Sequence, residues 1–381
     1  MTSDDPLIIL FALAGVVLVA LWLEKQGAVF RKFGAAAIVI MIGLVLSNLG
    51  VIPGESPVYE FLMGRGVLAG IVLILINVNL DSLRTAGKPM LIAFALGALG
   101  SAAGALAMAA SLRGPIGEEA WKLSGQFSGT YIGGGMNFAA IGQALGTRSD
   151  LFSAGIAADV IVTAFWLVAC LAIPEWFPPK VSAQESGAPL ANLSAHEGLG
   201  EKLHHSGAPM GLADFAGLAT LTLGTMAAAE GLEMLAPFMP KVLWLTTLAL
   251  VLAHVPFVRR LSGSVVMGNF LVLLFLASNG AKSVIAHIVG VGPSIFYYAA
   301  GTVAIHGLII FGIGRLMKMN LDLISIASQA NVGGSTTAMA LAGARGRPDL
   351  ILPGFAVGML GNALGNYAGM AVAYTAKMLV G

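Results

Sequence analysis

Residues Ser128–Asn137 read SGTYIGGGMN and place three consecutive glycines, Gly133, Gly134 and Gly135, inside an otherwise apolar region. Glycine is among the residues that most weaken a helix. Close packing of membrane helices uses small residues on one face, at every fourth position. Three glycines in a row instead remove side chains from every face. We therefore interpret this stretch as a functional break in a helix, with close packing as the alternative.

The composition is that of a polytopic membrane protein. Of 381 residues, 57% are hydrophobic and 10% are charged, and the mean hydropathy is +0.88, which excludes a soluble globular class. The first apolar run, 7–23, follows an acidic start and has no small-residue cleavage site, so we expect a retained helix rather than a signal peptide. The net charge of +1 indicates no nucleic-acid partner.

We expect an all-α fold with about ten transmembrane helices, because ten apolar runs approach the ~20 residues that a helix needs to cross a bilayer. A polar stretch, 174–209, divides the chain into a first repeat, 1–173, and a second repeat, 210–381. Two weaker segments, 121–145 and 321–345, are Gly-rich. The ten runs are 7–23, 33–49, 57–77, 89–110, 150–173, 211–230, 242–257, 264–279, 294–317 and 350–376.

The glycine stretch recurs in the second half of the chain. Ser128–Asn137 aligns with Ser328–Thr337 at a constant offset of 200, so that Gly133-Gly134 falls on Gly333-Gly334. After one single-residue gap the match continues to a shared Arg-x-Asp-Leu. Paired Gly-interrupted segments in two halves of a membrane protein are the best sequence pointer to the binding site of a secondary transporter.

The two Gly-rich segments either cross the membrane completely or return as re-entrant hairpins. Complete crossings make the two repeats parallel, whereas hairpins make them inverted. Lysine and arginine concentrate on the cytoplasmic side of membrane proteins. With hairpins, thirteen of the twenty Lys and Arg residues lie on that side, and with complete crossings the split is ten to ten. We therefore favour hairpins, with both termini outside and the two glycine tips meeting near mid-membrane.

Non-helical backbone at membrane depth is tolerated only where it is buried in protein or lines a wet cavity. There the amides and positive half-helix ends hold anions, and freed carbonyls hold Na⁺. For each polar residue near the tips, helix capping is the alternative. The predicted substrate-binding residues are Thr130, Gly133, Gly134, Gly135, Asn137, Asn331, Gly333, Gly334, Ser335, Thr336, Thr337, Asn362 and Asn366, and the candidate Na⁺ ligands are Asp159, Asn137 and Thr337.

Asp159 is the one acidic residue well inside an undisputed apolar span. An ionisable group at such depth is by default a functional hypothesis, so we interpret Asp159 as a coupling-ion ligand or proton carrier, against a structural or near-interface role. Its counterpart in the second half is Gly358, so the charge is not duplicated. The chain has no HExxH, GxSxG or GxxxxGK[ST] motif. We expect no enzyme activity and no cofactor apart from a coupling ion, Na⁺ or H⁺.

Three stretches, TYIGGGMNFAAIGQALG (130–146), ANVGGSTTAMALAGARGRPDLILPG (330–354) and SNLGVIPGESPVYEFL (47–62), resemble the YjcL-like family of bacterial membrane proteins, named as a domain of unknown function. That family is distantly similar to sodium:glutamate, 2-hydroxycarboxylate and bile-acid sodium symporters and to sodium/proton antiporters. The resemblance implies inverted repeats, a scaffold from the early helices of each half, and a hairpin-containing core that moves as an elevator, usually in a dimer.

The combined expectation is a Na⁺-coupled symporter for a small organic solute, anionic or zwitterionic, in the bacterial inner membrane. Its partners are that solute, Na⁺, the lipid bilayer and a second copy of the chain. The alternative is a sodium/proton antiporter that uses Asp159. The adjacent acidic pair of the antiporters is not matched, because Asp159 follows Ala158. A third class, an intramembrane enzyme or sensor subunit, lacks a catalytic motif.

Overall fold

The computed structural model describes residues 5–26, 28–78, 83–176, 210–283 and 285–380, and within these ranges every regular element is a helix. Gly87, with φ 72°, interrupts α5 near its start. A π-helical turn, Leu62–Gly66, joins α3 to α4. The α-helices are α1 Pro6–Gln26, α2 Ala28–Asn48, α3 Pro57–Phe61, α4 Val67–Leu75, α5 Leu83–Ile116, α6 Ala120–Gly133, α7 Gly135–Ala144, α8 Ser149–Trp176, α10 Leu212–Leu235, α11 Lys241–Leu252, α12 Pro256–Arg259, α13 Ser264–Lys282, α14 Ile285–Leu316, α15 Leu321–Val332, α16 Gly334–Ala344 and α17 Ile351–Val380.

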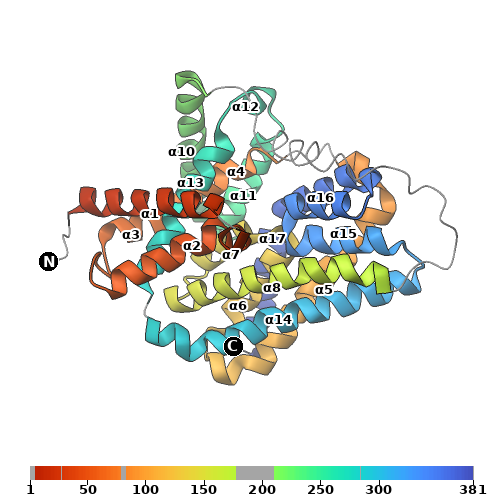
Figure 1. Ribbon diagram of the computed structural model, residues 1–381. Helices are drawn as coiled ribbons and strands as arrows, with labels where there is room; N and C mark the ends of the chain where they lie inside the picture. Colours follow the sequence, from red (N-terminus) through yellow and green to blue (C-terminus); the bar gives the residue numbers. More distant parts are fainter. Residues whose placement is uncertain (1–4, 27, 79–82, 177–209, 284, 381) are drawn as a thin grey trace.

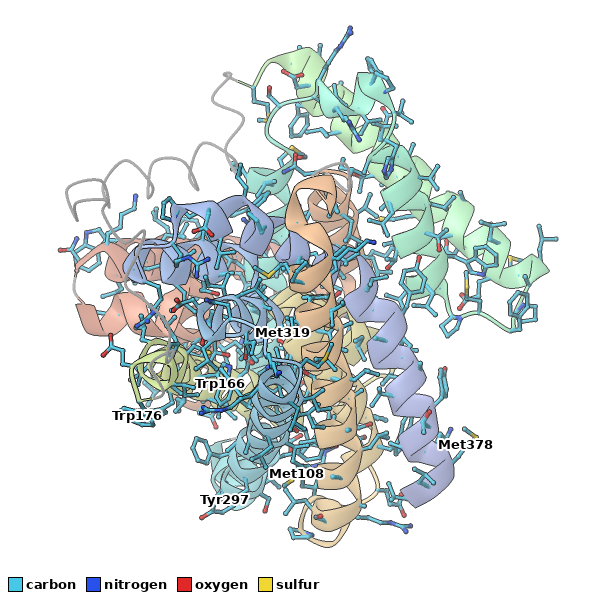
Figure 2. The ribbon with its side chains drawn as sticks, turned by 90° about the vertical axis from the view of Figure 1, so that its right-hand side faces the viewer. Met108, Trp166, Trp176, Tyr297, Met319 and Met378 are labelled. Atoms are coloured by element: carbon cyan, nitrogen blue, oxygen red, sulfur yellow. The ribbon has the colours of Figure 1, made fainter. Side chains whose placement is uncertain are left out.

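Each of the ten predicted apolar runs coincides with helical structure, although the run 242–257 is divided between α11 and α12. In the described part of the chain, seven helices are long and apolar enough to cross a membrane, and two apolar helices are shorter. Large apolar side chains such as Phe11 and Phe165 are exposed, and Figure 2 places Trp176 and Met378 on the periphery. Exposure of many large apolar side chains is unfavourable in water and suits lipid. The chain is a multi-pass, all-helical membrane protein.

The helices form two groups. In the first, α13 packs on α2 and α4, and α10 packs on α11. In the second, α5 packs on α14, and α17 packs on α5 and α6. Figure 1 shows the first group, α1–α4 with α10–α13, at the left and top, and α5, α6, α8 and α14–α16 below and to the right. Each group therefore takes helices from both halves of the chain.

Both Gly-rich segments are helical hairpins. In the first, α6 and α7 pack antiparallel, because the amide of Gln126 donates to Phe138 O at 3.3 Å and the Thr147 hydroxyl donates to Gln126 Oε1 at 2.9 Å. In the second, Arg345 Nε donates to Asp322 Oδ1 at 2.8 Å, so the start of α15 lies beside the end of α16. The two ends of each segment lie together, which favours the hairpin interpretation over complete crossings.

The predicted boundary between the two halves is only partly within the described residues. The structure continues α8 through Trp176 with Pro174 inside the helix, so the first three residues of the expected linker 174–209 are helical. The remainder, 177–209, lies outside the described residues. The division into repeats 1–173 and 210–381 stays a prediction.

Candidate functional site

The three glycines of the first hairpin have three different environments. Gly134 joins α6 to α7 with φ 83° and ψ 168°, a region of backbone conformation that is essentially restricted to glycine. Gly133 is packed so tightly against Gly361 O that a side chain would overlap it, whereas a methyl group at Gly135 meets nothing within 4 Å. Only Gly134 is required by the turn itself.

The second hairpin repeats this backbone. Gly334 also has φ 83°, and the glycines after the hairpins, Gly146 and Gly346, have φ 58° and 64°. Gly333, with φ −107°, ends α15 in an ordinary conformation. A positive φ thus occurs at the same two places in each hairpin, 200 residues apart.

Close packing, the alternative interpretation of the glycines, accounts for one side of α6. Glycines at every fourth position of α6 face glycines at every fourth position of α17, with the two helices antiparallel. A methyl group on Gly125 would lie 2.9 Å from Gly369 O, and one on Gly129 would lie 3.4 Å from Gly365 O. The expectation that close packing fails in this stretch is therefore wrong for Gly133, which belongs to the packing row. The pairs are Gly125 with Gly369, Gly129 with Gly365, and Gly133 with Gly361.

Both hairpin tips contact one turn of α17. A methyl group on Gly358 would lie 2.5 Å from Ser335 Cα of the second tip. A methyl group on Gly361 would lie 3.1 Å from Gly133 Cα of the first tip, and one on Gly134 would lie 3.8 Å from Asn362 Oδ1. Because Gly358 and Gly361 are less than one helical turn apart, the two tips lie close together within the molecule.

Buried polar atoms without hydrogen-bond partners gather beside these tips. Asn137, Thr130 and Gln329 are each 0% exposed. Both amide atoms of Asn137, both of Gln329 and the Thr130 hydroxyl have no partner. A buried polar group without a partner is energetically costly and calls for an explanation. Asn137 Nδ2 lies against Gly133 and Gly365, and Gln329 Nε2 lies against Gly333, so both amides border the breaks.

Asn366 adds one more unpartnered atom on α17. Its Nδ2 donates to Thr246 Oγ1 of α11 at 2.9 Å, while its Oδ1 has no partner. Gln329 and Thr246 were not among the predicted site residues. The signal for Gln329 is its amide in a helix of small and apolar residues, one turn before Gly333. No sequence signal connects Thr246 to the site.

The other predicted residues of the second tip differ in their surroundings. With its amide oriented so that Nδ2 faces the acceptors, Asn331 donates to Ala327 O and Phe94 O, both at 3.2 Å. It therefore ties α15 to α5. Ser335 is buried, Thr336 is exposed, and Thr337 is half-buried with its hydroxyl donating to Gly334 O at 3.1 Å. The Thr337 bond is a local contact within the tip, as in helix capping.

Asp159 lies on α8, on another side of α6 from Asn137. It is half-buried, accepts a hydrogen bond from Thr163 Oγ1 at 3.4 Å, and interacts with the Tyr131 side chain. The Tyr131 hydroxyl makes no hydrogen bond of good geometry. The grouping of Asp159, Asn137 and Thr337 as Na⁺ ligands stays a prediction.

A hydrogen-bonded network surrounds another buried polar residue, His306 of α14. Its Nδ1 lies 2.8 Å from Gly97 O, and its Nε2 lies 2.8 Å from Ser328 Oγ. Since a carbonyl only accepts, Nδ1 carries the proton and the Ser328 hydroxyl donates to Nε2. Ser328 Oγ in turn accepts from Trp166 Nε1 at 2.9 Å. His306 therefore has the bonding of a neutral structural residue that ties α14 to α5, α8 and α15.

The tip region is thus built from neutral amides, hydroxyls and backbone groups, with one carboxylate nearby. Across the described ranges, no three His, Cys, Asp or Glu residues are grouped as ligands for a metal ion. Amide and hydroxyl oxygens are suitable ligands for a hard monovalent or divalent cation, and the N-terminal turns of α7 and α16 present free N–H groups to an anion.

The fold and these hairpins define a polytopic membrane protein with two broken-helix tips around a buried polar cluster. A family model described as "Protein of unknown function (DUF819)" matches residues 8–379, and the chain belongs to this family. It is also similar to the "Uncharacterized membrane protein YjcL" of Bacillus subtilis (strain 168), with 28% identity over 384 residues, covering 97% of this chain and 96% of the relative. The predicted family resemblance is confirmed.

Proposed function

We propose that the protein is a secondary active transporter, a Na⁺-coupled symporter for a small organic solute that is anionic or zwitterionic. The observation that carries the proposal is the convergence of two broken hairpins on Gly358–Asn362 of α17, with unpartnered amides of Asn137 and Gln329 beside the breaks. Irregular backbone and buried unpaired polar groups at this depth are expected where a solute or ion binds.

The chemistry of the tips suggests which groups bind the solute and which bind the ion. The free N–H groups at the starts of α7 and α16 suit a carboxylate or another anionic group. The amide and hydroxyl oxygens of Asn137, Thr130 and Gln329 suit the polar groups of a solute or a Na⁺ ion. Na⁺ bound at the tips would complete the binding site for the solute. The binding of Na⁺ and the binding of the solute would therefore be coupled.

The two helix groups support an elevator mechanism within this proposal. The group α1–α4 with α10–α13 is the scaffold, and the group α5–α8 with α14–α17 is the mobile core that carries both hairpins. In the proposed arrangement, the halves are inverted repeats, the hairpins enter from opposite sides, both termini lie outside the inner membrane, and two copies join through their scaffolds. The positive φ values at Gly134 and Gly334 support the repeat.

Uptake into proteoliposomes tests the proposal. A thermal-shift screen of amino acids, dicarboxylates and small peptides in Na⁺ and in K⁺ first selects the solute. We then expect Na⁺-dependent uptake of that solute, reduced at least tenfold by Asn137→Ala, because a ligand hydrogen bond to a buried amide is lost. Thr222→Ala is the matched control, since its buried hydroxyl in α10 is also unpartnered but lies far along the chain from both tips.

The site assignment fails if no cation stabilises the protein and Asn137→Ala and Asp159→Asn leave uptake unchanged. A sodium/proton antiporter is the second candidate, favoured by one observation: the Asp159 carboxylate is held in a membrane helix beside the Tyr131 hydroxyl. It predicts a Na⁺-driven pH change in vesicles without any organic solute, abolished by Asp159→Asn. Absence of that change, together with solute uptake, selects the symporter.

A further inference from the structure

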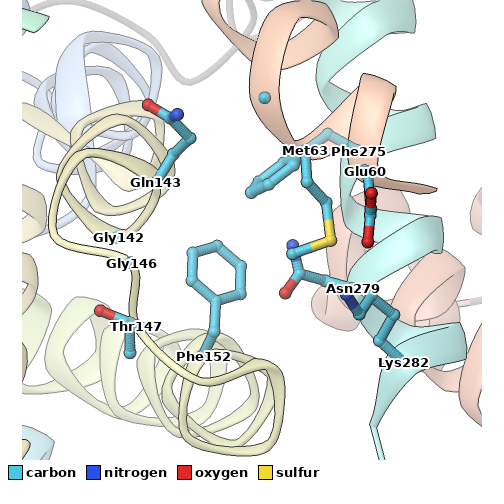
Figure 3. A pocket seen from close by; sticks show the side chains of 11 residues that line it. Glu60, Met63, Gly142, Gln143, Gly146, Thr147, Phe152, Phe275, Asn279 and Lys282 are labelled. Atoms are coloured by element: carbon cyan, nitrogen blue, oxygen red, sulfur yellow. The ribbon is translucent and has the colours of Figure 1, made fainter. Parts of the chain in front are cut away.

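A cavity of about 270 Å³ opens at the base of the first hairpin, away from the tips. Its walls come from α3 and the π-turn after it, from the end of α7 with the following turn, from the start of α8, and from α13 (Figure 3). The α7 residues that line it begin at Gly142, eight residues after Gly134. At 1.5 Å per residue the cavity is about 12 Å from the first tip, so it is a separate site.

Three polar side chains of the cavity, those of Glu60, Asn279 and Lys282, have groups that the fold does not use. Asn279 is 1% exposed and its Nδ2 has no hydrogen-bond partner. Figure 3 shows Asn279 facing the space between α13 and the α7–α8 turn. Glu60 and Lys282 also line the cavity, and neither has an ion pair with any described residue. One carboxylate, one ammonium and one buried amide therefore remain available in the same cavity.

The apolar part of the lining contains two aromatic rings in contact. Phe152 and Phe275 pack edge to face, with ring centroids 5.4 Å apart, and both line the cavity. Met63 and Gly64 come from the π-turn Leu62–Gly66. Short π-helical segments occur frequently at functional sites. The Gly64 position is open, because a methyl group there meets no atom within 4 Å.

We propose that this cavity binds a small zwitterion, an α-amino acid with an apolar side chain. Lys282 pairs with the carboxylate, Glu60 pairs with the ammonium group, and the Asn279 amide completes the polar contacts. Phe152, Phe275 and Met63 hold the side chain. Small-molecule sites are typically apolar cavities with a few polar groups that fix orientation, and the volume is near the lower end of the usual range. The proposal rests on the cavity alone, whose walls come from both helix groups.

Three probes with the same apolar side chain test whether both charges of the zwitterion are required. The experiment uses the full chain in lipid nanodiscs. These probes are L-leucine, 3-methylbutylamine, which lacks the carboxylate, and 4-methylpentanoate, which lacks the ammonium group. We expect L-leucine to raise the melting temperature in a concentration-dependent manner and the other two to have little effect at the same concentrations. Equal effects of all three probes, or no effect of L-leucine, overturn the proposal.

Four variants locate the bound L-leucine. Lys282→Gln and Glu60→Gln should each weaken its apparent affinity at least tenfold, the order expected for one lost charge-assisted contact. Gly64→Leu should abolish binding by filling the cavity, whereas Gly224→Leu, at another open helical glycine, should not. Unchanged binding in Lys282→Gln, or its loss in Asn137→Ala with Lys282→Gln unaffected, places the ligand elsewhere and refutes the assignment.

Discussion

The two hairpins share a backbone but are held in place differently. The first contributes Phe127 and Phe138 to a chain of ring contacts that runs from Tyr298 of α14 to Phe275 of α13. The second, α15 and α16, contains no aromatic residue. Its base is closed by ion pairs from Arg345 and Arg347 to Asp322, at 2.8 and 3.4 Å.

The second helices of the two hairpins, α7 and α16, also differ in burial. In α7, six successive residues, 137–142, are buried, whereas in α16 Thr336 and Ala340 are exposed. Aromatic packing and the contacts of its glycines with α17 hold the first hairpin. The second hairpin depends more on the ion pairs at its base, and it is the better candidate for a part that moves when a solute binds.

Removal of one aromatic ring should give the largest loss of stability and so tests this contrast first. Phe138→Ala should lower the free energy of unfolding by about 3–5 kcal/mol, because Phe127, Phe152 and their neighbours lose a fully buried partner. Met339→Ala in α16 should lower it by about 2 kcal/mol. Thermal unfolding in one fixed detergent measures both, with lipid-facing Phe165→Ala as control. Equal losses in the two hairpins would contradict the comparison.

The glycines before the two breaks provide the second test. Gly133→Ala places a methyl group against the Gly361 backbone, so we expect a loss of about 1–3 kcal/mol from overpacking. Gly333→Ala meets only the ends of the Gln329 and Thr337 side chains, which can move, and should lose less than about 1 kcal/mol. Gly135→Ala, in open space, is the neutral control. A larger loss at Gly333 than at Gly133 would reverse the assignment.

The ion pairs at the base of the second hairpin give the smallest effect. Asp322→Asn should destabilise by about 0.2–1 kcal/mol, and the difference from the native protein should shrink in high salt. A second effect concerns Asp349. The hydrogen bond that Arg347 donates lowers the pKa of the Asp349 carboxyl, so the Arg347–Asp349 pair contributes its full stabilisation above the ordinary carboxylate pKa of about 4. It is lost as the pH falls through the lowered value. Melting temperatures at two salt concentrations and across acidic pH check both effects, with Lys122→Gln at the first hairpin as the matched variant.

Much of the architecture could be predicted from the sequence, because its signals are local. The ten apolar runs are helical, and they could be predicted because the length and hydropathy of a run are properties of that run alone. The breaks at Gly134 and Gly334 could be predicted since glycine permits a backbone that other residues avoid. The charge distribution favoured hairpins over complete crossings, and the hairpin-like folding of both segments agrees with this preference. Charge says nothing about which helices pack together.

The remaining features depend on contacts between distant residues. The row Gly125, Gly129 and Gly133 has the spacing of a packing face, but its partner on α17 lies more than 220 residues away. Thr246 reaches Asn366 from α11 across 120 residues. Asp159 interacts with Tyr131, whereas the Asn137 amide borders Gly133. One sequence without a structure does not show which side of a helix faces which neighbour.

The antiparallel glycine row between α6 and α17 also has a consequence for biogenesis. The partner of Gly125 is Gly369, near the end of the chain. At about 5–20 residues per second of synthesis, the 244 intervening residues take on the order of tens of seconds. During that time the first hairpin lacks α17, the helix against which its glycine row packs. We therefore expect the nascent protein to need an insertion machinery or a temporary neighbour that shelters this hairpin until α17 has been synthesised.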